Sequence, residues 1–129
     1  MKKNLVTMFL LALGFVTVLH PVFAHHSVAP FDMEHAITIK GTVTNFEWSN
    51  PHTWIYLAVK DNDGTVEQWR IEGNSPNMLT RVGWKREMIK PGDQETVIGF
   101  PAKNGKKVMR MDSILLTNGQ KFDGQGLKY

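Results

Sequence analysis

The fold is decided by residues 36–72, which read AITIKGTVTNFEWSNPHTWIYLAVKDNDGTVEQWRIE. Apolar and polar side chains alternate over residues 36–43, which is typical of a half-buried strand. A second strand over 53–60 has Ile55, Leu57 and Val59 on one face and aromatic residues with Ala58 on the other, and a third over 65–72 carries Trp69 and Ile71. The apolar parity switches after Val43, and this switch predicts a β-bulge. Residues 49–51 (SNP) and 61–64 (DNDG) are turn sequences, and the second indicates a β-hairpin. These residues therefore predict three consecutive strands.

The downstream sequence predicts a short helix and two further strands. Ser75 can cap a helix over residues 76–82, and Gly83 can end it. Strands are expected over residues 95–100 and 107–116, between turns at 90–93, 103–106 and 117–120. Three strands, a short helix and two strands is the element order of the OB-fold. We predict an all-β, OB-fold-like five-stranded barrel over residues 36–122, and a two-layer sheet with a helix plug is the alternative.

The first 24 residues differ from the rest of the chain. They begin with Lys2 and Lys3, continue with an apolar run over residues 5–19, and end in small or apolar residues. This pattern predicts a secretory signal peptide, cut after Ala24, and hence a periplasmic or secreted protein. The alternative is an uncleaved anchor, although the run is shorter than the roughly 20 residues of a membrane-spanning helix. The exported chain would start with an arm over residues 25–35 and end in a flexible tail over 123–129.

Composition narrows the function classes. The chain has 129 residues and no cysteine, which fits one domain and excludes disulfides and thiolate metal sites. Loss of Lys2 and Lys3 with the leader lowers the net charge from +3 to +1, which argues against nucleic-acid binding. The sequence has no catalytic serine elbow, phosphate-binding loop, dinucleotide fingerprint or HExxH motif. We therefore expect a binding protein that is not an enzyme.

Five blocks of sequence carry a resemblance to a known family. They are His25-His26-Ser27, Gly41-Thr42-Val43, residues 48–54 (WSNPHTW), residues 75–77 with Gly83-Trp84, and residues 90–93 (KPGD). With these blocks the chain resembles a family of small exported bacterial proteins known only as a domain of unknown function. The resemblance implies an exported, single-domain, β-rich protein and implies no activity.

The histidines suggest a metal site. After cleavage, His25 would offer its α-amine and its imidazole to one metal ion, and His26, His35 or His52 could add another nitrogen. Such a nitrogen-rich set suits Cu(II) best. The alternative for the arm is a solvated tail, and for His52 a structural role against a turn carbonyl or Trp54.

Two further groups of side chains have both a binding and a packing interpretation. Met109 and Met111 share one face of a predicted strand, where they would be a thioether pair for Cu(I) or ordinary core. Trp48, Trp54 and Tyr56 cluster around one turn, near the strands with which OB-folds bind their ligands. They predict an aromatic-lined accessory module for a glycan or a peptide or protein partner, and core and rim packing is the alternative.

Overall fold

The computed structural model describes residues 30–124. Its strands are β1 (Ile37–Glu47), β2 (Trp54–Lys60), β3 (Val66–Glu72), β4 (Gln94–Pro101), β5 (Val108–Leu115) and β6 (Lys121–Asp123). Helix α2 (Pro76–Arg81) and the 3-10 helix η1 (Arg86–Met88) lie between β3 and β4. The predicted signal peptide lies outside the described residues, and so do His25 and His26 of the predicted arm.

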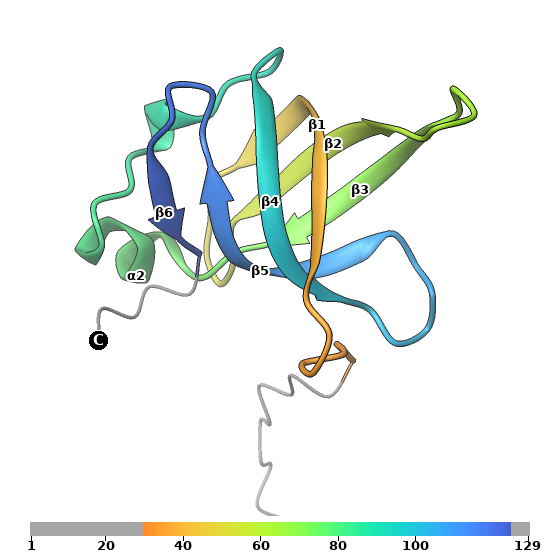
Figure 1. Ribbon diagram of the computed structural model, residues 1–129. Coiled ribbons are helices and arrows are strands. Elements are labelled where there is room, and N and C mark those ends of the chain that lie inside the picture. Colours follow the sequence, from red (N-terminus) through yellow and green to blue (C-terminus); the bar gives the residue numbers. More distant parts are fainter. Residues whose placement is uncertain (1–29, 125–129) are drawn as a thin grey trace, which may run out of the picture.

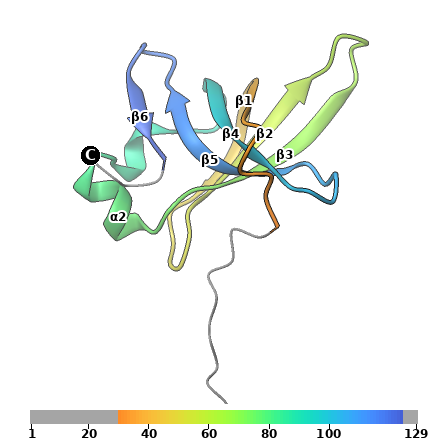
Figure 2. The ribbon, with the colours of Figure 1, turned by 60° about the horizontal axis from the view of Figure 1, so that its bottom comes forward.

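The strands close into a barrel (Figure 1). The sheet order is β3-β2-β1-β4-β5-β6, and β3 also pairs in parallel with β5 through Arg70–Glu72 and Val108–Arg110. This parallel pairing joins the two sides of the sheet into a five-stranded barrel and confirms the OB-fold-like prediction over the two-layer alternative. In both views α2 lies beside β6, and the tip of the β2–β3 hairpin extends away from the barrel (Figure 2).

Two local predictions from the sequence are confirmed. The register of β1 against β2 shifts between Val43 and Asn45, where the parity switch predicts a bulge. Ser75 caps α2 by accepting a hydrogen bond from the backbone N–H of Met78, and Gly83 follows the helix with a φ of 95°. Beyond the bulge β1 continues to Glu47, so it is longer than predicted. The sequence predicts neither η1 nor β6.

The barrel interior is filled by the apolar side chains that alternate inward along the strands. Ile55 and Leu57 of β2, Ile71 of β3 and Val97 of β4 are at most 1% exposed. Met109 and Met111 of β5 are equally buried, which places both thioethers in the packed core. Trp84, after α2, is also buried, and its indole N–H donates to the carbonyl of Asp123 at 2.8 Å, so it ties the helix region to β6. Among residues 30–124, no helix is long and apolar enough to span a membrane.

Candidate functional site

An aromatic and cationic cluster lies on the outer face of β2 and β3. Trp54 and Tyr56 alternate with the buried Ile55 and Leu57, so their rings lie outside the barrel and are partly exposed. Arg70 of β3 pairs in register with Tyr56. Its guanidinium carbon lies 4.7 Å from the centroid of the Trp54 ring and 5.7 Å from that of Tyr56, which is the geometry of a cation–π contact. We call Trp54, Tyr56 and Arg70 the outer-face cluster.

Glu47 fixes the tyrosine of this cluster. The register of β1 against β2 places Glu47 opposite Trp54, and the Tyr56 hydroxyl donates to Glu47 Oε1 at 2.9 Å. Partial burial raises the pKa of the Tyr56 phenol, and the hydrogen bond to Glu47 raises it further. The phenol therefore keeps its proton and its orientation at neutral pH.

His52 lies next to the outer-face cluster, just before β2. Its Nδ1 is 2.5 Å from Oε1 of Glu72, a β3 residue that pairs in register with Trp54. The two side chains are 29% and 12% exposed, respectively. The adjacent Thr53 is buried and donates its hydroxyl to the carbonyl of Asn74, which fastens this turn to the end of β3. The structural role expected for His52 thus takes the form of a pair with a carboxylate.

Trp48 belongs to a different group of side chains from Trp54 and Tyr56. Its ring meets that of Phe46 edge to face, with centroids 5.7 Å apart, and both rings pack against the core. Of the three aromatic residues expected to form one cluster, the contacts therefore join Trp54 and Tyr56 through Arg70 and place Trp48 with the core. The cluster that could meet a ligand is smaller, and more cationic, than the sequence predicts.

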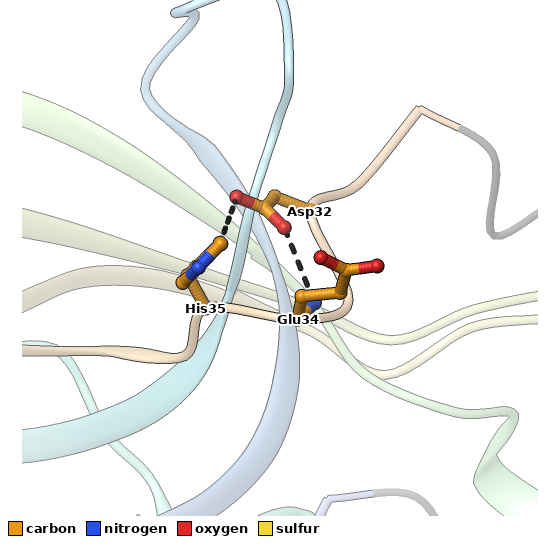
Figure 3. A network of polar contacts seen from close by, with 3 residues as sticks. All are labelled: Asp32, Glu34 and His35. Carbon is orange, nitrogen blue, oxygen red and sulfur yellow. Dashed lines mark hydrogen bonds and ion pairs between the residues drawn. The ribbon is translucent and has the colours of Figure 1, made fainter.

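His35 is held by Asp32 on the segment that precedes β1 (Figure 3). Asp32 Oδ2 accepts from His35 Nδ1 at 2.9 Å, and Oδ1 accepts from the backbone N–H of Glu34 at 3.1 Å. The hydrogen bond from His35, followed by that from Glu34, lowers the pKa of the Asp32 carboxyl. The His35 side chain is 76% exposed. A carboxylate on Nδ1 leaves Nε2 as the ring nitrogen for a ligand, an arrangement common at metal-bound histidines.

The predicted metal ligands are not gathered in the described part of the chain. His35 precedes β1 and His52 follows it, so the two imidazoles lie in separate pairs at the two ends of that strand. Across residues 30–124, no group of three or more histidine, aspartate or glutamate side chains is placed to hold a metal ion. A site of the predicted kind would have to be completed by His25 or His26.

Sequence reasoning missed the charged members of the candidate site, Arg70, Glu47 and Glu72. The signal for two of them was present in the hairpin turn at residues 61–64, because a turn of known position fixes the register of its two strands. Asp61 lies opposite Thr65 across the loop of residues 62–64, and counting outward from that pair puts Tyr56 opposite Arg70 and Trp54 opposite Glu72. Glu47 depends on the bulge in β1, whose effect on register the sequence does not specify.

Comparison with known proteins identifies a family for this chain but does not assign it an activity. One family model, described as a family of unknown function, matches residues 14–110, which include β1 to β4 and the start of β5. No curated protein matches the chain. No residue role can therefore be carried over from a relative.

Proposed function

Because the chain belongs to DUF6152, a family of unknown function, its activity has to be inferred from its own residues, and we propose that it is an exported binding protein. In this proposal the outer-face cluster recognises a protein partner that presents a carboxylate. The observation that carries the proposal is the position of the Arg70 guanidinium over the partly exposed ring of Trp54.

The composition of the cluster supports a protein partner. Trp, Tyr and Arg are the residue types most enriched among those that dominate binding energy at protein interfaces. The strand 2–3 face is also where OB-folds bind their ligands. A sugar that stacks on tryptophan needs an open ring face, whereas Arg70 lies over the ring of Trp54. This geometry favours a polypeptide over the glycan alternative.

The charges of the cluster support an acidic group on the partner. Glu47 is engaged by the Tyr56 hydroxyl, and Glu72 by His52. Within residues 30–124, Arg70 forms no ion pair with a carboxylate, since the ion pairs there are His35–Asp32, His52–Glu72 and Lys107–Glu67. A guanidinium that lies over an aromatic ring can still bind a carboxylate through two hydrogen bonds.

Site-specific crosslinking in the exporting bacterium tests this proposal. A photoreactive phenylalanine analogue replaces Tyr56, and in a matched control it replaces Thr38, which lies on the exposed side of β1. We expect a crosslinked protein from the Tyr56 position only. The protein identified in this way is then purified, and its affinity for the chain is measured.

The affinities of variants then test whether the outer-face cluster is responsible for binding this partner. We expect Arg70→Ala and Trp54→Ala each to weaken binding at least tenfold, because truncation of a dominant interface residue costs about 2 kcal/mol or more. The exposed Lys60→Ala at the end of β2 is the control and should change the affinity less than twofold. If all three variants bind the partner as tightly as the wild type does, the proposal is contradicted. Binding of a soluble oligosaccharide by the same face would support the glycan alternative.

A second candidate function, copper binding, is favoured by one specific observation, the orientation of His35 by Asp32. In this proposal His25 provides its α-amine and imidazole after cleavage, and His35 provides Nε2. Cu(II) titration of a chain that starts at His25 is compared with that of a chain carrying one extra residue before it. We expect the extra residue, and His35→Ala, to weaken binding at least tenfold, whereas His52→Ala should not. Unchanged affinity with the extra residue would rule out this site.

Export itself is tested by N-terminal sequencing of the protein from a periplasmic extract. A chain that starts at His25 is expected from the pattern of residues 1–24. A chain that keeps these residues and sediments with membranes would instead support the anchor alternative.

A further inference from the structure

A pocket opens at the end of the barrel where β4 begins and β5 ends, which is uppermost in Figure 1. Its volume is about 280 Å³, and it lies away from the outer-face cluster, on other strands. It is lined by Met88, Asp93, Glu95, Leu116, Thr117 and Asn118. Two of these six side chains are carboxylates, and neither takes part in the function proposed above.

Glu95 is the unusual member of this pocket. It alternates with Val97 and Gly99 on the inward side of β4, and it is only 1% exposed. Its Oε2 is buried without a hydrogen-bond partner. Its Oε1 lies 3.5 Å from the hydroxyl of Thr117, but that hydroxyl has one proton and donates it at 2.7 Å to the carbonyl of Gln94. The backbone N–H and the hydroxyl of Thr117 act to lower the pKa of Glu95, but burial outweighs them, so an ionised Glu95 is a buried charge that is only partly compensated.

The surroundings of Glu95 make this charge costly. Burial beside Met88 and Leu116, together with the negative charge of Asp93, raises the pKa of Glu95 to about 7. A polar atom left unsatisfied in this way costs about 1–3 kcal/mol, and more when it is charged. Leucine would avoid this cost, and glutamine would avoid the part of it that is due to the charge, so packing alone does not explain the carboxylate.

A bound cation would both neutralise the buried negative charge of Glu95 and give its unpartnered Oε2 atom a contact. Asp93 uses Oδ2 to accept the backbone N–H of Lys90 at 2.8 Å, which holds its carboxylate at the pocket. Because the Thr117 hydroxyl donates its hydrogen bond to the carbonyl of Gln94, its oxygen lone pairs are available to a cation. We propose that this pocket binds a hard divalent cation of the calcium class, with Glu95 and Asp93 supplying the charge and Thr117 a neutral oxygen.

Calcium suits the site better than magnesium. Its coordination by six to eight oxygens is flexible and accepts water for the positions that the protein does not fill, whereas magnesium demands near-octahedral geometry. Two carboxylates form a site of low charge. The expected dissociation constant is therefore in the range of extracellular calcium modules, roughly 10⁻⁴ to 10⁻³ M.

Calorimetric titration with CaCl₂ tests the proposal on the purified protein at pH 8, after EDTA treatment and at constant ionic strength. We expect one saturable site and a rise in melting temperature with calcium concentration. Glu95→Gln should weaken binding at least tenfold while melting cooperatively and, without calcium, at least as high as the wild type. A residue that serves only packing would not combine lost binding with retained or increased stability.

Two further variants keep the test decisive. Asp93→Asn retains an acceptor for the Lys90 N–H and should also weaken binding, so it covers the case in which Glu95→Gln does not fold. Glu67→Gln removes one negative charge on β3, where Glu67 pairs with Lys107, and should bind calcium within twofold of the wild type. No saturable binding up to 10 mM CaCl₂, on the order of ten times the weakest expected constant, would overturn the proposal. Equal binding by wild type and Glu95→Gln would also overturn it.

Discussion

At the scale of single residues, the ionisation of Glu95 links pH to stability. Its folded-state pKa is raised from 4.5 to about 7, so the folded protein holds this proton over a pH range in which the unfolded chain releases it. The contribution of the protonated group to stability is complete below pH 4.5 and is lost as pH rises to 7. The shift corresponds to a loss on the order of 3 kcal/mol.

We therefore expect the stability of the wild type to fall relative to that of Glu95→Gln between pH 5 and pH 8. Urea unfolding in EDTA at each pH measures this difference, and the comparison cancels groups common to both proteins. Glu67→Gln should show no such trend against the wild type. A difference between wild type and Glu95→Gln that does not change with pH would mean that Glu95 ionises as in the unfolded chain.

The residues show where sequence reasoning reaches its limit. Period 2 separates Trp54 and Tyr56 from Ile55 and Leu57, but because both faces of this strand are apolar the sequence does not decide which of them packs inward. Period 2 in residues 95–99 also places Glu95 on the side of Val97, but the side chains that line its pocket, such as Met88 of η1 and Leu116 after β5, come from other parts of the chain. Contacts such as Arg70 on Trp54 cross between strands and need the register as well as the pattern.

At the scale of elements, Gly99 permits the close pairing of β4 with β5. The register shifts between Ile98 and Gly99, and a Cβ at Gly99 would lie 2.4 Å from the carbonyl oxygen of Arg110. We expect Gly99→Ala to lower the free energy of unfolding by about 1–3 kcal/mol, because the strands must separate to admit a methyl group. Urea unfolding measures the loss, and Lys40→Ala on the exposed side of β1 should change it by less than about 0.5 kcal/mol. A loss no larger than that of the control would show that β5 moves aside freely.

The elements differ in how well their own residues specify them. Turn sequences separate β1, β2 and β3, and all three strands have runs of β-branched or aromatic residues, so the sequence predicted their positions within a few residues. β6 has only three residues, and it exists because β5 offers it an edge and Phe122 packs against Trp84, with ring centroids 5.7 Å apart. A strand held by such non-local contacts leaves no period in the sequence.

At the scale of the whole molecule, the barrel is held closed without disulfides, so core packing at the β3–β5 seam must supply its stability. Met109 pairs with Ile71 across this seam and is fully buried. We expect Met109→Ala to cost about 2–5 kcal/mol, a large part of the 5–15 kcal/mol typical of a domain, and to lower the melting temperature by about 4–8 °C per kcal/mol. The same substitution at Met33, which is 37% exposed, should cost less than about 1 kcal/mol. Calorimetry of both variants measures the two losses, and equal losses would show that closure of the barrel does not depend on this seam.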